Sequence, residues 1–146
     1  MDNLTKEQRH RNMKAVKSKG SRIETALAKA LWAKGFRYRK NDKTVFGKPD
    51  FTFKKYKIAV FVDSEFWHGK DWHIKKHNHK SNQGFWHTKI ERNIERDEEV
   101  NIQLIFENWT VLRFWGKDIE KNLQSCVNEI ELKINEAKNE QNIKSS

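Results

Sequence analysis

The sequence predicts an α/β domain, because apolar strand-like segments alternate with segments of helical periodicity along the chain. The strongest strand signal is the continuously apolar run at 58–62, which is typical of a strand buried inside a sheet. A helical pattern follows at 86–104 and a second strand pattern at 110–115. Because the chain has 146 residues and no proline-rich linker, we expect a single domain over 1–138 and a disordered polar tail at 139–146.

Two helices are expected ahead of the first strand. Residues 5–16 are a candidate for a basic helix, and residues 17–20 are interpreted as a loop. A second helix is predicted to begin at Ser21, since Glu24 three residues later completes the pattern of a capping box. Gly35 is expected to end it. The apolar residues of this helix recur on one face: Ile23, Leu27, Ala30 and Leu31.

The remaining elements follow from composition and spacing. Short strands are predicted at 36–39 and 50–53, ahead of the buried strand. Residues 63–84 are polar, aromatic and histidine-rich without a period, and a loop of this length inside a small domain is usually functional. The last helix carries apolar residues at helical spacing: Ile119, Leu123, Val127, Ile130 and Ile134.

The charge of the chain favours a polyanionic partner. Lys and Arg number 30 against 20 Asp and Glu, and the net charge of +10 would attract a nucleic-acid backbone over a long range. The same charge also fits a basic protein without such a partner. No apolar run approaches the ~20 residues that span a bilayer, and the first residues include no apolar signal segment, so a cytoplasmic protein without a membrane partner is expected. The single cysteine, Cys126, excludes an internal disulfide.

Two places in the chain offer groups for phosphodiester hydrolysis. Asp50 follows residues 47–49 (Gly-Lys-Pro) at the mouth of a strand, where a fixed carboxylate could hold Mg²⁺. A Pro-Asp turn is the structural alternative. His68 stands just past the buried strand, next to Phe66 and Trp67, so its imidazole could act on a phosphate while the rings stack on bases. Burial of the rings and a structural histidine are the alternative.

Two further carboxylates are candidates. Asp97 shares a helix face with Asn93 and could orient an imidazole, although a solvated helix face also explains such charges. Glu24 could reach a metal through water, a role that would compete with capping. The Glu-x-Lys sequence that usually completes this nuclease pattern is absent, because residues 62–64 read Val-Asp-Ser.

In order and spacing, these residues resemble the very-short-patch repair (Vsr) DNA mismatch endonucleases over about residues 8–118. The resemblance is carried by Arg11-Asn12-Met13, Glu24, the GKPDF segment, FWH after the buried strand, FWHTKIERNIERD and NWTVLRFW. It implies a restriction-endonuclease-like core of the PD-(D/E)xK type, with a central mixed β-sheet flanked by helices. It further implies Mg²⁺-dependent nicking of one strand of double-stranded DNA near a T:G mismatch.

The resemblance also implies roles for individual residues. Asp50 would be the essential magnesium ligand, the backbone carbonyl of Val62 would be a second ligand, and Glu24 would reach the metal through a water molecule. His68 would be the general base or would position the attacking water, with Asp97 as its orienting partner.

Further metal and DNA contacts follow from the same resemblance. Asp63 is a possible additional metal ligand. Met13, Phe66 and Trp67 occupy the places of an intercalating wedge that opens the base stack. The residues expected to contact DNA are Arg11, Asn12, Met13, Lys48, Phe66 and Trp67.

The chain departs from the family at its structural zinc site. Ser64 replaces a glycine there, and the ligand positions hold Glu65, Lys70, Trp72 and Lys117. The zinc site of the family is therefore not expected, and Mg²⁺ is the expected cofactor. A different zinc site remains an alternative, built from the loop histidines His73, His77 and His79.

Three functions stay open at this point. The leading one is a Vsr-like nicking endonuclease. The alternatives are a restriction or homing-type nuclease that cuts intact DNA, and a basic DNA-binding module whose catalytic site has decayed. Double-stranded DNA is the expected partner, and the resemblance adds mismatch-repair or DNA-methyltransferase-associated proteins. A monomer is expected.

Overall fold

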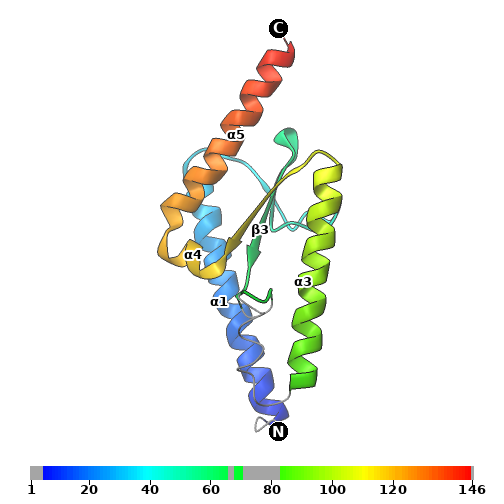
Figure 1. The fold of residues 1–146 in the computed structure, drawn as a ribbon. Helices are drawn as coiled ribbons and strands as arrows, with labels where there is room; N and C mark the ends of the chain where they lie inside the picture. The colour runs from blue at the N-terminus through cyan, green and yellow to red at the C-terminus, as the bar shows by residue number, and fades with distance from the viewer. Residues whose placement is uncertain (1–4, 66–67, 71–82, 146) are drawn as a thin grey trace.

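The computed structural model describes residues 5–65, 68–70 and 83–145, and it has a four-stranded mixed sheet between two layers of helices (Figure 1). In spatial order the strands are β1 (Arg39–Lys40), β2 (Phe51–Phe53), β3 (Ile58–Asp63) and β4 (Thr110–Trp115). The helices are α1 (Lys6–Ala33), α3 (Gln83–Phe106), α4 (Gly116–Lys121) and α5 (Leu123–Ser145), and the 3-10 turn η1 (Lys54–Tyr56) joins β2 to β3. The predicted α/β architecture is confirmed.

Strand pairing determines which residues meet at the end of the sheet. Strands β1, β2 and β3 pair antiparallel, whereas β3 and β4 pair parallel. Parallel neighbours need a crossover, and α3 lies within the connection that supplies it. In the parallel register Phe61 lies opposite Arg113 and Asp63 lies opposite Trp115. The carboxyl ends of β3 and β4 therefore lie side by side.

The core divides between the two faces of the sheet. Ile58 and Val60 of β3 face the layer of α1, α4 and α5, and they pack with apolar residues of those helices. Ala59 and Phe61 face α3, where they pack with Val100 and Leu104. This alternation is what a strand buried on both faces requires, and the central strand predicted at 58–62 is confirmed, with Asp63 added at its end.

The first helix is longer than predicted. Helix α1 is continuous from Lys6 to Ala33, so the expected loop at 17–20 is wrong. Its capping box is formed at Thr5, whose hydroxyl accepts from the Gln8 N–H while the Gln8 side chain accepts from the Thr5 N–H. Helix-forming residues surround Gly20, and one glycine in such a segment costs too little to break it.

The capping box expected at Ser21 is wrong for the same reason. Ser21 lies inside α1, and its carbonyl accepts a hydrogen bond from the Thr25 hydroxyl. Glu24 is therefore in the middle of a helix and has no capping role. The expected competition between helix capping and metal binding for the Glu24 carboxylate therefore does not arise.

Two further boundaries differ from the sequence-based expectation. The strand predicted at 36–39 is reduced to the edge strand β1, because residues 34–36 are hydrogen-bonded back to the end of α1 and the Arg37 guanidinium lies 3.5 Å from the centre of the Trp32 ring. The tail predicted at 139–146 is helical through Ser145, since α5 continues and the Gln141 amide donates to the Lys55 carbonyl (2.8 Å). No helix among the described residues is long and apolar enough to cross a membrane.

The continuity of α1 can be tested at Gly20. A Cβ added there meets no atom within 4 Å, so Gly20→Ala should stabilise the protein by about 0.5–1 kcal/mol through helix propensity alone. Gly20→Pro should cost about 3 kcal/mol, because proline breaks a helix interior. Urea unfolding of the two variants beside the wild type measures these changes. A proline variant as stable as the wild type would contradict the continuous helix.

Candidate active site

A cleft of about 380 Å³ opens at the carboxyl end of β3, between the turn ahead of β2 and helix α3. Segments that are far apart in the sequence line it, and they include most of the residues expected to act in catalysis. The lining side chains with chemical function are Lys48, Asp50, Asp63, His68, Asn93, Arg96, Asp97 and Arg113. The cleft is therefore the candidate active site.

Asp50 is held at the mouth of β2 by a tight turn. Gly47 has a positive φ of 80° and packs against α3 so closely that any Cβ would overlap the Val100 side chain. Lys48 follows with φ of 50° and is exposed at the cleft. The turn brings Asp50 to β3, where its Oδ2 accepts a hydrogen bond from the Val62 N–H (2.7 Å).

Glu24 and Asp50 form an electrostatically coupled pair, although they come from different elements. Burial raises the pKa of Glu24 to about 7, and the negative charge of Asp50 and a hydrogen bond shared with it add to the effect, against a smaller opposing contribution from Lys40. Two carboxylates that repel each other in this way favour a shared proton or a shared cation. Their oxygen ligands, beside the backbone of Val62, fit a hard divalent cation such as Mg²⁺.

His68 is oriented by Asp97 from α3. The His68 Nδ1 lies 2.5 Å from the Asp97 Oδ2, and the His68 backbone N–H donates to the Ser64 carbonyl (2.9 Å). Gly69 has φ of 67°, and a Cβ there would clash with Ile94, so the turn lies directly on α3. Because Nδ1 faces Asp97, Nε2 is the ring nitrogen left for proton exchange with a substrate.

The surroundings of His68 favour its charged form. Burial alone would lower the pKa of His68, but the hydrogen bond to Asp97 and the negative charges of Asp63 and Asp97 outweigh burial and the opposing charge of Arg113. The pKa of His68 is therefore raised above its usual value. A proton accepted by this imidazole would be stabilised where it arrives.

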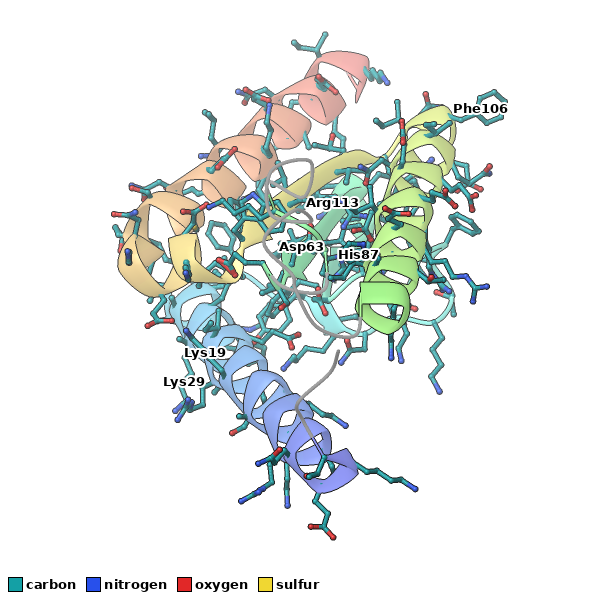
Figure 2. All side chains as sticks on the ribbon, turned by 60° about the horizontal axis from the view of Figure 1, so that its bottom comes forward. Lys19, Lys29, Asp63, His87, Phe106 and Arg113 are labelled. Atoms are coloured by element: carbon teal, nitrogen blue, oxygen red, sulfur yellow. The ribbon has the colours of Figure 1, made fainter. Side chains whose placement is uncertain are left out.

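Asp63 has a partner that the sequence analysis missed. Its carboxylate accepts from the Arg113 Nη1 at both oxygens (3.0 and 3.2 Å), and the two side chains lie together beside α3 in Figure 2. Burial raises the pKa of Asp63, and the charges of His68 and Arg113 only partly offset this effect. A signal for Arg113 was present, since an arginine inside an apolar strand pattern requires a buried partner.

Asp63, His68 and Asp97 form a second group that could hold a cation, because one donor atom of each lies within 4.8 Å of the others. The Arg113 guanidinium already provides a cation at this place. A metal ion here would have to displace it or be repelled by it. The Asp63 side is thus a poorer metal site than the Glu24–Asp50 side.

The residues at the positions of the family's zinc ligands make other contacts in this chain. The Glu65 Oε2 accepts from the Lys117 backbone N–H (2.8 Å), which joins the turn after β3 to the start of α4. The Lys70 ammonium lies 5.7 Å from the ring centre of Trp115. A hydrogen bond and a cation–π contact therefore hold this region together. Trp72 and the histidines His73, His77 and His79 lie outside the described residues.

The residues expected to contact DNA are only partly described. Arg11 is exposed on the amino-terminal part of α1, which extends beyond the sheet (Figures 1 and 2). Asn12 and Met13 lie on the same helix, but their side chains are outside the described part of the chain, as are Phe66 and Trp67.

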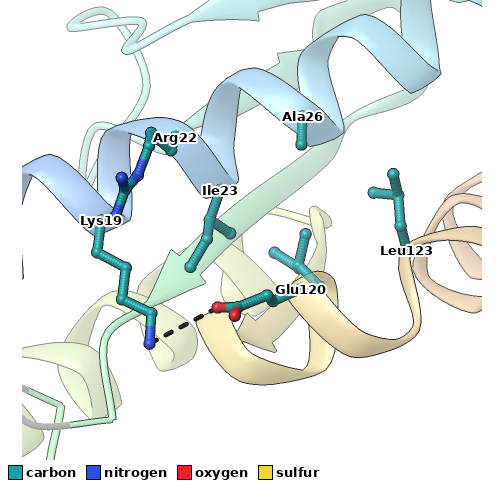
Figure 3. A pocket seen from close by; sticks show the side chains of 7 residues that line it. Lys19, Arg22, Ile23, Ala26, Glu120 and Leu123 are labelled. Atoms are coloured by element: carbon teal, nitrogen blue, oxygen red, sulfur yellow. Dashed lines mark ion pairs between the residues drawn. The ribbon is translucent and has the colours of Figure 1, made fainter.

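A second pocket, of about 310 Å³, lies between α1, α4 and the start of α5 (Figure 3). Ile23, Ile119 and Leu123 form its apolar lining, and Lys19 pairs with Glu120 at 3.6 Å beside it. It contains neither a pair of carboxylates nor a histidine. It is therefore a seam between helices and is not a candidate catalytic site.

Comparisons with known proteins identify the family. A family model described as DNA mismatch endonuclease Vsr matches residues 1–74, which is just over half of the 146 residues. A type II nicking enzyme of Neisseria meningitidis serogroup C, V.NmeDIP, is 59% identical over 130 residues, covering 89% of this chain and 88% of that protein. The type II nicking enzyme V.HpaIIP of Haemophilus parainfluenzae is 56% identical over 137 residues, covering 93% and 97%.

A more distant relative carries the family name itself. The DNA mismatch endonuclease Vsr of Escherichia coli K12 is 33% identical over 107 residues, covering 73% of this chain and 68% of that protein. The resemblance inferred from the sequence and the restriction-endonuclease-like core are thus confirmed. The chain belongs to the family of DNA mismatch endonucleases described as Vsr, and it is a DNA endonuclease.

Proposed function

We propose that the protein is a Mg²⁺-dependent endonuclease that nicks one strand of double-stranded DNA near a T:G mismatch. The observation that carries this proposal is that His68 and Asp97 line the same cleft as Asp50, which interacts with Glu24. The coupled carboxylates Glu24 and Asp50 suit a metal ion, and the hydrogen-bonded pair His68 and Asp97 suits proton transfer. Strand nicking is also in the names of the relatives V.NmeDIP and V.HpaIIP.

On the metal side, Asp50 and the backbone carbonyl of Val62 would hold Mg²⁺ directly, and Glu24 would do so through water. When bound, the ion supplies charge that stabilises the phosphate and the departing oxygen. The hydrogen bond from the Val62 N–H orients the Asp50 carboxylate in advance, so less order has to be created when DNA binds.

On the other side, His68 would take a proton from the attacking water at Nε2. Asp97 fixes the ring orientation through Nδ1 and stabilises the imidazolium that results, as carboxylates do for catalytic histidines elsewhere. The cations Lys48 and Arg96 at the cleft would attract the backbone phosphates of the substrate.

A third set of residues would recognise the mismatch. Met13, Phe66 and Trp67 are proposed to wedge between base pairs, which costs least where pairing is already weak. The net charge of +10 would supply affinity that does not depend on sequence. We propose a monomer that acts on DNA in the cytoplasm, with mismatch-repair or DNA-methyltransferase-associated proteins as partners.

A DNA-binding module with a decayed site is the less economical alternative. A site without selection has no reason to keep all four of its acid–base groups, yet Glu24, Asp50, His68 and Asp97 are all present, and three of them line one cleft. A nuclease that cuts intact DNA would differ in its substrate preference, because a T:G duplex and a matched duplex would be cut alike.

Replacing the proposed metal ligand should abolish cleavage but not binding. Asp50→Asn keeps the size of the side chain and removes its charge, so nicking of T:G-containing supercoiled plasmid in Mg²⁺ should be lost. DNA affinity should stay within about tenfold, because the basic surface remains. A gel nicking assay and fluorescence anisotropy on the same preparation measure both. An Asp50→Asn protein that nicks at a near wild-type rate would refute the assignment.

The base role of His68 makes a different prediction. His68→Ala should lower the single-turnover nicking rate by about 100-fold or more, the usual scale for a general base. The Asp97→Asn variant should retain its residual activity to lower pH than the wild type does. Asp97 raises the pKa of His68, and a general base works only when it is unprotonated. Rates measured across pH on a pre-bound mismatched duplex provide the test. Identical pH profiles for the wild type and Asp97→Asn would count against the pairing.

The Glu24–Asp50 pair predicts an effect of pH on the stability of the metal-free protein. The pKa of Glu24 is raised from 4.5 to about 7 on folding, so the folded state binds more protons and stability should fall as pH rises between those values. In EDTA, Glu24→Gln should remove this fall and melt above the wild type at pH above 7. Mg²⁺ should raise the Tm of the wild type more than that of Glu24→Gln. Equal responses of the two proteins to Mg²⁺ would contradict a metal-binding pair.

A further inference from the structure

Arg113 donates hydrogen bonds to three different residues at the cleft. It comes from the middle of β4 and faces α3. Its Nη1 donates to both oxygens of Asp63, its Nε donates to the Asn101 side chain (2.7 Å) and its Nη2 donates to the Asp97 carbonyl (3.4 Å). The guanidinium also lies 4.1 Å from the centre of the Phe61 ring. A planar group held in this way has one orientation.

These contacts matter because two carboxylates compete for the same imidazole nitrogen. The His68 Nδ1 lies 2.5 Å from Asp97 and 3.7 Å from Asp63. A ring drawn toward Asp63 would rotate away from Asp97 and change where Nε2 points. With both oxygens of Asp63 bound to Arg113, Asp97 is the carboxylate that makes the short contact.

A direct contact between Arg113 and DNA is disfavoured by the same geometry. Its side chain is only 18% exposed, and each of its three nitrogens already donates to a protein oxygen. Phosphate contacts are usually made by exposed cations, such as Lys48 at the same cleft.

We propose that Arg113 is a positioning residue of the nicking reaction: it binds Asp63 and the Asp97 backbone so that His68 is oriented by Asp97 alone. This inference rests on the proposed role of His68 as the base. Arg113 does not touch the reacting atoms, and it acts through Asp63 and Asp97. Partners of this kind typically change activity by 10–100-fold when they are removed.

The test compares Arg113→Met with the double variant Arg113→Met, Asp63→Asn. The single variant leaves Asp63 as an uncompensated carboxylate beside His68, so the single-turnover rate at saturating DNA should fall about 10-fold or more, with the DNA Kd nearly unchanged. The double variant removes the competing charge and should recover most of that rate. Arg113→Lys should act like the methionine variant, because an ammonium cannot reproduce the fork.

The matched control is Arg37→Met, which removes the same charge from the surface near Trp32, away from the cleft. It should leave the rate at saturating DNA unchanged. A wild-type rate in Arg113→Met, or a double variant slower than the single variant, would overturn the proposal. The latter result would instead mean that Asp63 itself serves the reaction.

A second measurement separates this inference from the proposed function. The ¹⁵N resonances of the His68 ring report which nitrogen is hydrogen-bonded, and they can be recorded on metal-free protein without any activity. The wild-type pattern should change in Arg113→Met and return in the double variant. An unchanged pattern in Arg113→Met would overturn the positioning role even if His68 is the base. If His68→Ala retained full activity, the base role of His68 would be refuted. The ring spectra of the wild type and of Arg113→Met would still test the positioning role of Arg113.

Discussion

The parallel pairing of β3 with β4 is the constraint on which the rest of the structure depends. It requires a crossover, which includes α3, and it places the carboxyl ends of two strands side by side. Because alternate residues face opposite layers, Phe61, Asp63 and Arg113 face α3 while Val60 faces α1. Asp97, Val100 and Asn101 on α3 then meet the strand residues directly. The site is thus assembled by the same alternation that forms the core.

The cleft divides into two electrostatic halves. On one side burial and the charge of Asp50 raise the pKa of Glu24, and Lys40 offsets only part of this effect. On the other side Arg113 compensates Asp63, and His68 is paired with Asp97. Excess negative charge favours a divalent cation, whereas the guanidinium bound to Asp63 opposes one. The two sides therefore differ in their balance of charge.

The sequence predicted the elements that have a strong apolar pattern and the pairing of His68 with Asp97, but it did not predict the partners of Asp63 or Arg113. The strand at 58–62 was predicted because buried strands are continuously apolar, and the strand at 110–115 was predicted from its β-branched and aromatic residues. The loop expected at 17–20 is wrong because one glycine costs too little free energy to break a helix, and the cap expected at Ser21 is wrong with it. The helical end of α5 depends partly on the contact between Gln141 and Lys55, which are far apart in the sequence. Arg113 was missed because its role depends on Asp63 and Asn101, and pairing across a sheet cannot be seen in one linear pattern.

The central claim is that the cation binds on the Glu24–Asp50 side and that His68 and Asp97 are left for proton transfer. Anomalous diffraction from crystals of the protein with mismatched DNA and Mn²⁺ in place of Mg²⁺ tests this claim most directly, because it locates the ion without any assumption about the reaction. The account predicts an anomalous peak at the Asp50 carboxylate and the Val62 carbonyl, with Arg113 still bound to Asp63. A peak among Asp63, His68 and Asp97, with Arg113 displaced, would contradict it.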